Sequence, residues 1–177
     1  MVGGDRDKVL GDVREYKWRR AGYTPSGVPA NLSILRSLRK PLIVMTPKSL
    51  LRHKLSVSAF DDLTHGSFHE VIGEVDDLVE KNVDRVVFCS GKVYFDLYQA
   101  RQKQELQNVA LVRIEQLYPF PREEYEAVLD AYPNAKEVLW CQEEPENQGA
   151  WYQIKHRLSA YLRPHQHLLY ATRKGSA

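Results

Sequence analysis

The chain has 177 residues, of which 43% are hydrophobic and 27% are charged, and its formal net charge is +2. That length suits one compact domain with a single core and excludes a large multidomain enzyme. No apolar run approaches the roughly 20 residues that cross a bilayer, and Asp5 and Asp7 stand where a targeting peptide would be basic or apolar. We therefore expect an intracellular protein without a membrane partner.

Charge is segregated along the chain in a way that the net charge hides. Residues 1–54 hold 12 Lys or Arg against 4 Asp or Glu, residues 55–146 hold 8 against 19, and residues 147–177 hold 5 against none. Basic surfaces for anionic partners are therefore possible in a nearly neutral chain. Residues 16–20 interleave aromatic and basic side chains, but no nucleic-acid-binding motif frames them, and we predict no nucleic-acid partner.

The predicted elements begin after an irregular start. Residues 1–28 hold charged and turn-forming residues without a sustained apolar period, and we expect them to be a poorly ordered leader. Residues 32–38 carry three leucines on one stripe of a short predicted helix. The polar stretch 53–81 is predicted to be a long excursion on one side of a sheet.

Five continuous apolar runs have the length of buried strands, and three helical patterns lie among them. Such runs suit strands covered on both faces, as in a parallel sheet. Strands that alternate with helices predict an α/β domain wound by right-handed crossovers. Pro121, with two glutamates behind it, predicts one helix start, and Asn147 is a predicted cap for the last helix. The predicted strands are 42–45, 85–89, 109–114, 137–141 and 168–171, and the predicted helices are 93–100, 125–132 and 150–161.

Cysteine and histidine spacing gives little support for a metal site. Cys89 and Cys141 each end an apolar run without a CxxC spacing, which predicts buried free thiols in a reducing compartment. His65 and His69 would share one face of a helix, but the intervening glycine disfavours a helix and no third ligand is identifiable. We predict no metal.

Two basic loops follow predicted strands. Residues 90–92, Ser-Gly-Lys, end one strand and open a helix, so backbone N–H groups, a hydroxyl and an ammonium could meet at one anion. Residues 47–53 follow the strand 42–45 at the edge where open α/β sheets bind ligands. Tight turns with solvated lysines and arginines are the alternative at both places. The predicted anion-binding residues are Lys48, Ser49, Arg52, Ser90 and Lys92.

An acidic turn lies between the last two apolar runs. Residues 142–151 hold Glu143, Glu144 and Glu146 beside a predicted helix start. Paired carboxylates can act as general acid and base, and they can equally complement a helix dipole. No nucleophile elbow or Ser/His/Asp order is present, so we predict no catalytic residue.

Four strings, in order, closely resemble the C-terminal domain of 2-oxoglutarate dehydrogenase, the thiamine-diphosphate-dependent decarboxylating component of its complex. The resemblance covers residues 40–177 almost continuously and includes residues 29–36, whereas residues 1–28 do not take part. The strings are KPLIVMTPKSLLRH (40–53), CSGKVYFDL (89–97), VALVRIEQLYPFP (109–121) and VLWCQEEPENQGAW (138–151).

The resemblance implies a three-layer α/β fold over residues 29–177, like the transketolase C-terminal domain, with a mostly parallel sheet of about five strands and helices on both faces. Such a domain supports dimer assembly, and in some relatives it contributes to an acetyl-coenzyme A effector site. An acetyl-coenzyme A or adenine-nucleotide effector would suit the predicted anion-binding residues. The chain is thus expected to act in a homodimer or with further enzyme domains.

The resemblance also implies what this chain does not do alone. Family members bind thiamine diphosphate and magnesium through other domains, and this sequence has no Gly-Asp-Gly motif of that kind. The isolated chain is therefore expected to be inactive. The parent enzyme decarboxylates 2-oxoglutarate in the tricarboxylic acid cycle and passes the succinyl group to a lipoyl succinyltransferase partner. The expected location is the cytoplasm, or the mitochondrial matrix in a eukaryote.

Two questions stay open at this point. The chain could instead be a free-standing α/β module that binds a nucleotide or coenzyme A through its basic edge. Five aromatic residues could form an exposed interface with missing neighbours, or could pack in the core of this domain. They are Tyr118, Phe120, Trp140, Trp151 and Tyr152.

Overall fold

The computed structural model describes residues 47–65 and 69–176, which fall into two units divided between His69 and Glu70. Each unit is considered by itself. The first contains the 3-10 helix η2 (Lys48–Arg52) and the short helix α3 (Phe60–Thr64). The predicted leader, the helix at 32–38 and the strand at 42–45 lie outside the described residues.

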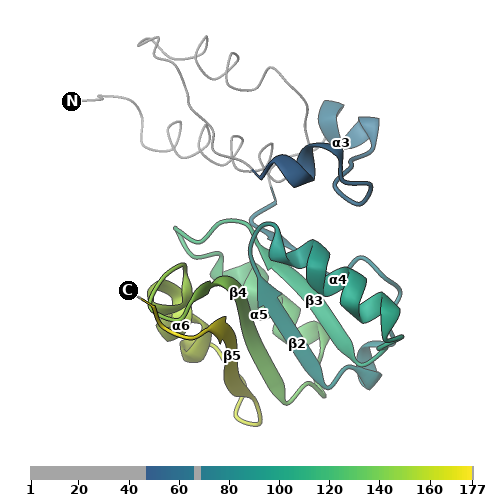
Figure 1. Cartoon of the computed structure of the whole chain (residues 1–177). Helices are drawn as coiled ribbons and strands as arrows, with labels where there is room; N and C mark the ends of the chain where they lie inside the picture. The colour runs from purple at the N-terminus through teal and green to yellow at the C-terminus, as the bar shows by residue number, and fades with distance from the viewer. Residues whose placement is uncertain (1–46, 66–68, 177) are drawn as a thin grey trace, which may run out of the picture. The chain divides into compact units, whose positions relative to one another are not determined.

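The second unit is built on a five-stranded sheet with the order β1-β3-β2-β4-β5 (Figure 1). The inner strand β2 pairs in parallel with β3 and β4, and β4 pairs in parallel with β5, whereas β1 is antiparallel to β3. The predicted α/β class with a mostly parallel sheet is therefore confirmed. The strands are β1 (Val71–Ile72), β2 (Arg85–Cys89), β3 (Val109–Ile114), β4 (Glu137–Pro145) and β5 (His167–Arg173).

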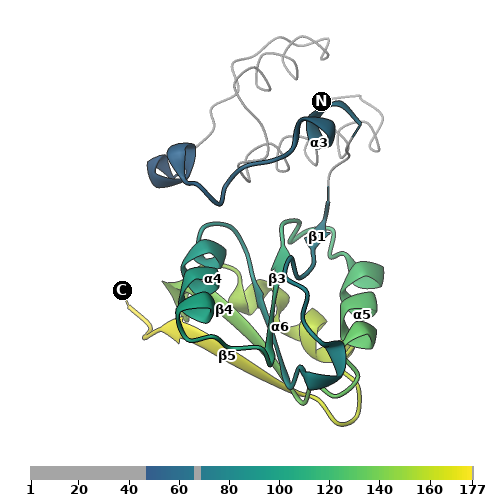
Figure 2. The same ribbon diagram turned by 90° about the vertical axis from the view of Figure 1, so that its right-hand side faces the viewer.

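Helices lie on both sides of this sheet (Figure 2). Strand side chains alternate between the two faces, and α5 (Arg122–Ala131) and α6 (Trp151–Ala160) cover the face to which Phe88 and Trp140 belong. The opposite face is covered at β2 and β3 by α4 (Val93–Lys103). The short 3-10 helix η3 (Glu80–Asn82) precedes β2. We call these the α5/α6 face and the α4 face.

The main hydrophobic core lies under α5 and α6. The rings of Phe88 and Tyr125 stand 4.9 Å apart, and the Tyr125 hydroxyl donates to the Leu158 carbonyl at 3.1 Å, which ties the two helices together. Burial of aromatic and aliphatic side chains of this size stabilises a fold by about 1.5–3 kcal/mol each. Trp140 and Trp151 belong to this core, so the suggestion that they form an exposed interface is wrong for both.

Sequence patterns located one helix start correctly and one incorrectly. Pro121 precedes α5 with glutamates in the first turn, as predicted. Asn147 does not cap α6, because the amide of Gln142 already accepts the Trp151 backbone N–H at 2.9 Å. The Asn147 side chain instead bonds the backbone of Ser176 through both its donor and its acceptor.

A buried ion pair fixes the polar segment that follows β1. Arg101 of α4 donates to both carboxylate oxygens of Glu74, to Asp76 at 2.6 Å and to the Val109 carbonyl at 3.0 Å. Glu74 also accepts the Leu111 backbone N–H of β3 at 2.7 Å, a hydrogen bond that a backbone carbonyl of a neighbouring strand would otherwise accept. Burial alone would raise the pKa of Glu74, but hydrogen bonds from Arg101 and the backbone lower it below its ordinary value.

Both cysteines are free and buried, as predicted. Burial raises the pKa of the Cys89 thiol well above its ordinary value, and that of Cys141 rises for the same reason. Among the residues that the structure describes, no helix is long and apolar enough to cross a membrane.

Candidate functional site

The carboxyl ends of the parallel strands surround a hollow of about 580 Å³. Open α/β sheets bind ligands at this edge, because the loops that leave the strands diverge there and helix N-termini face the gap. We call it the carboxyl-edge hollow. Its lining residues are Ser90, Leu117, Tyr118, Trp140, Gln142, Glu144, Gly149, Ala150, Gln153, His156 and Arg157.

Gln142 on β4 holds the wall of this hollow together. Its amide oxygen accepts the Trp140 indole N–H and the Trp151 backbone N–H, each at 2.9 Å. Its amide nitrogen donates to the carbonyls of Pro145 at 3.0 Å and Gln148 at 2.8 Å. A buried amide that uses both its oxygen and its nitrogen costs little to bury and fixes the turn between β4 and α6.

Gly149 makes this turn possible. Its φ is +69°, which L side chains rarely adopt, and a Cβ there would lie 3.0 Å from both the Gln142 amide nitrogen and the Glu144 Cβ. The Gln-Gly-Ala-Trp string is thereby explained locally, since glycine admits the conformation and the close approach. Sequence analysis did not predict the structural role of Gln142. The pattern that could have indicated it is an amide side chain between a buried strand and an Asn-Gln-Gly turn.

The Ser90-Gly91-Lys92 turn lies where β2 ends, as predicted. Gly91 has φ +72°, and Ser90 lines the hollow. The Lys92 ammonium is 2.7 Å from a Glu143 carboxylate oxygen and 3.4 Å from Asp96. The hydrogen bond with Glu143 raises the pKa of Lys92. Lys92 therefore links the end of β2 to the acidic turn, and an anion would have to share or replace Glu143.

The three carboxylates of the acidic turn have separate surroundings. Glu143 pairs with Lys92, and Glu144 lines the hollow. Glu146 accepts the hydroxyls of Tyr152 at 3.1 Å and Tyr170 at 3.4 Å. This geometry shows no pair of carboxylates facing each other, so it gives no support to a general acid and base at this turn.

Helix α6 adds basic side chains that were not predicted as site residues. Gln153, His156 and Arg157 face the hollow from successive turns, and residues 147–177 hold no Asp or Glu. Their spacing of three and four was visible in the sequence, but the same period also described the buried stripe of the helix. Together with Ser90, these groups suit an anionic ligand whose apolar part would contact Leu117 and Tyr118.

The other predicted anion-binding residues lie in the first unit. Lys48, Ser49 and Arg52 are all on η2, and each is exposed. Ser90 and Lys92 belong to the second unit, so the grouping of all five around one anion stays a prediction. His65 contacts the Thr64 hydroxyl at 2.9 Å. Within residues 47–65 and 69–176, no group of three or more His, Cys, Asp or Glu could hold a metal ion.

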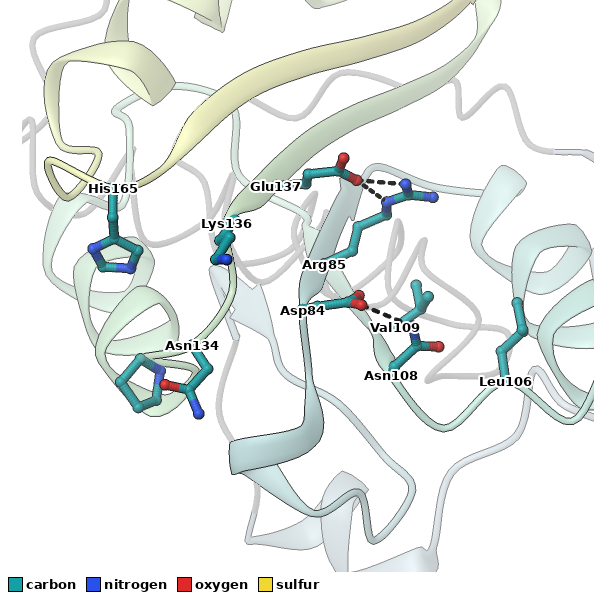
Figure 3. Close-up of a pocket in the computed structure, with 10 residues that line it drawn as sticks. Asp84, Arg85, Leu106, Asn108, Val109, Asn134, Lys136, Glu137 and His165 are labelled. Atoms are coloured by element: carbon teal, nitrogen blue, oxygen red, sulfur yellow. Dashed lines mark hydrogen bonds and ion pairs between the residues drawn. The ribbon is translucent and has the colours of Figure 1, made fainter.

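A larger hollow, of about 860 Å³, lies at the opposite edge of the sheet, where the strands begin (Figure 3). We call it the amino-edge hollow. Arg85 pairs with Glu137 across the starts of β2 and β4, with Nε 2.6 Å from the carboxylate, and Asn108 donates to Asp84 at 3.0 Å. Its lining residues are Asp84, Arg85, Leu106, Asn108, Val109, Pro133, Asn134, Lys136, Glu137 and His165.

Comparison with known proteins adds evidence independent of this geometry. The family model described as 2-oxoglutarate dehydrogenase C-terminal matches residues 57–177. The chain is 53% identical over 147 residues to the 2-oxoglutarate dehydrogenase E1 component of Azotobacter vinelandii, a match that covers 81% of this chain and 16% of that protein. The E1 component of Haemophilus influenzae is 52% identical over 143 residues, which cover 81% of this chain and 15% of that protein. The E1 component of Coxiella burnetii is 51% identical over 146 residues, which cover 81% of this chain and 16% of that protein. This chain therefore spans about a sixth of the length of these curated relatives.

Proposed function

The chain belongs to the 2-oxoglutarate dehydrogenase C-terminal family, and from this premise we propose that it serves an E1 component as an assembly and regulatory domain. The observation that carries the proposal is identity of about one half to E1 components over 81% of the chain. The matched region 57–177 includes the whole five-stranded sheet. An α/β unit whose sheet has helices on both faces fits such a role.

We propose that the E1 component served by this domain decarboxylates 2-oxoglutarate in the tricarboxylic acid cycle and passes the succinyl group to a lipoyl succinyltransferase partner. Thiamine diphosphate and magnesium would supply the carbanion chemistry on other E1 domains. The lack of a Gly-Asp-Gly string in this sequence supports that division of labour. The proposed location is the cytoplasm.

A domain exchange tests the assembly role. Residues 57–177 would replace the matching region of the Azotobacter vinelandii E1 component, with the same protein truncated before that region as the control. The chimera should form the native oligomer and turn over 2-oxoglutarate, while the truncated control should not. A chimera that folds by circular dichroism but neither assembles nor turns over substrate would contradict the proposal.

The regulatory part of the proposal concerns a phosphate-bearing effector, acetyl-coenzyme A or an adenine nucleotide, at the carboxyl-edge hollow. Ser90, His156 and Arg157 offer donors to an anion there, and Lys92 stands beside them with its charge held by Glu143. Lys48, Ser49 and Arg52 lie on η2 of the first unit, and anion binding by these residues is a separate proposal.

Calorimetry with acetyl-coenzyme A and with ADP tests this site. Arg157→Ala and Lys92→Ala should each weaken binding about tenfold, as loss of one charge-assisted hydrogen bond predicts, and added salt should weaken it further. Glu143→Gln should strengthen binding because it releases Lys92. Gln99→Ala, on the exposed surface of α4, is the control. Affinities that none of the three site variants changes would remove the effector from this hollow.

A further inference from the structure

The two faces of the sheet are covered unequally. The registers align Leu111, Val87, Leu139 and Leu169 in one row across β3, β2, β4 and β5 on the α4 face. Leu111 is 2% exposed and Val87 is 6% exposed, Leu139 is half-buried, and Leu169 is 39% exposed. The cover that α4 provides is therefore lost step by step toward β5.

The next row repeats the trend. Arg113 and Cys89 are buried on β3 and β2, Cys141 is 9% exposed on β4, and Ala171 is exposed on β5. We call the surface formed by Leu139, Leu169 and Ala171 the open face, and Cys141 beside them is buried. Parallel strands are normally covered on both faces, so an apolar surface here is a candidate for an interface.

The size of the open face fits one helix. Neighbouring strands lie about 4.8 Å apart, so two strands present a width of about 10 Å, which is the diameter of a helix and the usual spacing between packed helices. On the α5/α6 face, two helices cover the strands, whereas α4 covers the other face among the described residues. One more helix beside α4 would complete that layer.

The charge around the open face indicates which charge a helix bound there should carry. His167, Arg173 and Lys174 are exposed on β5 and just beyond it. The nearest acids on β4 are engaged, Glu137 with Arg85 and Glu143 with Lys92. An acidic occupant is therefore favoured.

Charge also argues against symmetric pairing of two copies through their β5 strands. Symmetric pairing of two β5 strands would bring Arg173 and Lys174 of one copy to the basic β5 of the other.

We propose that the open face binds one acidic amphipathic helix of a partner polypeptide, with the apolar side of the helix on Leu139 and Leu169 and its carboxylates toward Arg173 and Lys174. This inference does not depend on the effector site, which lies at the strand ends.

Fluorescence anisotropy tests the proposal with a labelled peptide of about 18 residues, long enough to form a helix, that carries leucines at i, i+3, i+4 and i+7 and glutamates on the flanks. A scrambled peptide of equal composition is the control. The full chain should bind the amphipathic peptide at least tenfold more tightly, and salt should weaken the complex. Hydrogen exchange should show new protection in residues 167–173.

Two variants locate the binding surface. Leu169→Glu should weaken peptide binding about tenfold, and Arg173→Glu should weaken it several-fold. Leu106→Glu is the matched control, because Leu106 is 37% exposed and lies off the open face, and it should leave affinity unchanged. Circular dichroism checks the fold of each variant, and Arg173→Glu, at the exposed strand end, keeps the test valid if Leu169→Glu fails to fold.

Three results would overturn the proposal. Equal affinity for the scrambled peptide would show that composition alone drives binding. Equal weakening by Leu106→Glu and Leu169→Glu would place the peptide elsewhere. Self-association by light scattering that Leu169→Glu abolishes, and that the peptide does not compete with, would show that a second copy covers the open face.

Discussion

The two edges of the sheet are both hollowed, yet they use their polar side chains differently. At the amino edge, the larger hollow of about 860 Å³ has polar side chains that bond across the starts of neighbouring strands. At the carboxyl edge, the hollow of about 580 Å³ has a wall fixed by Gln142 and donors from α6 directed into it. The pairs of Arg85 with Glu137 and Asn108 with Asp84 engage polar side chains at the amino edge, which favours the carboxyl edge for the proposed ligand although its hollow is smaller.

The physical reason lies in the direction of the strands. Chains that leave the carboxyl ends of parallel strands must turn into helices, so the edge carries turn glycines, helix starts and polar side chains held by backbone. The segments that enter the amino ends of the strands come from helix C-termini and pair with neighbouring strands from their first residues. Two pairs of side chains there, Arg85 with Glu137 and Asn108 with Asp84, connect the starts of neighbouring strands.

The largest expected effect compares a buried ion pair outside both hollows with the exposed pair of the amino edge. Arg101 reaches the first residue of β3 and forms the buried pair with Glu74. Arg101→Met should lower the free energy of unfolding by about 3–5 kcal/mol, because it leaves the Glu74 carboxylate buried and unpaired. Arg85→Met, which breaks an exposed pair with Glu137, should cost less than about 1 kcal/mol. Urea unfolding measures both, and similar losses would contradict the distinction.

The same pair predicts how stability depends on pH. The folded-state pKa of Glu74 is lowered from its ordinary value of 4.5, so the ionised carboxylate stabilises the fold above that pH. This contribution is lost as pH falls through the lowered pKa. Stability of the natural chain should therefore fall below about pH 4.5, and Arg101→Met should flatten that dependence. An unchanged profile in the variant would show that other carboxyl groups cause the loss.

A smaller loss is expected when the wall of the carboxyl edge is broken. Gln142→Leu removes the acceptor of the Trp140 and Trp151 N–H groups and should cost about 2–4 kcal/mol. Gln153→Leu, on the exposed side of the hollow, should change stability by less than about 0.5 kcal/mol. Chemical unfolding compares the two variants. A small loss in the free energy of unfolding for Gln142→Leu would mean that water can replace the amide.

Glycine substitutions sharpen the comparison at the level of one methyl group. Gly149→Ala should cost about 1–3 kcal/mol, because it forces a left-handed alanine and places its Cβ 3.0 Å from the Gln142 amide nitrogen. Gly91→Ala, with φ +72° but open space, should cost about 1 kcal/mol. Gly73→Ala has neither constraint and should be neutral. Thermal unfolding would refute this ranking if all three variants behaved alike.

The smallest effect on stability is expected at the ion pair beside the hollow. Lys92→Ala and Glu143→Gln should each change the free energy of unfolding by less than about 1 kcal/mol, since both side chains are partly exposed. A double-mutant cycle by urea unfolding measures their coupling. A coupling above about 2 kcal/mol would make this pair structural, like the buried pair of Arg101 and Glu74.

Hydrophobic patterning by itself determined the central strands and the three long helices. The runs at 85–89 and 109–114 coincide with β2 and β3. Continuous apolar stretches of that length are typical of strands that are buried on both faces of a sheet. Periodicity also indicated α5 and α6, whose apolar stripes repeat every turn. It located α4 as well but predicted the wrong stripe, because Ala100 is exposed whereas Tyr94 and Phe95 are buried. The alternation of these strands and helices predicted the α/β class, and the resemblance of four strings to a known family implied the same fold.

Tertiary structure determined the features that depend on contacts between residues distant in sequence. The strand β1 has two residues in a polar stretch and exists through its pairing with β3 and through Arg101 holding Glu74, which is distant in sequence. Asn147 had the chemistry of a cap, but Gln142 took that role because β4 brings its amide to the start of α6. Such contacts depend on where the backbone places two remote residues, and a sequence records the chemistry of each residue but not the distance between them.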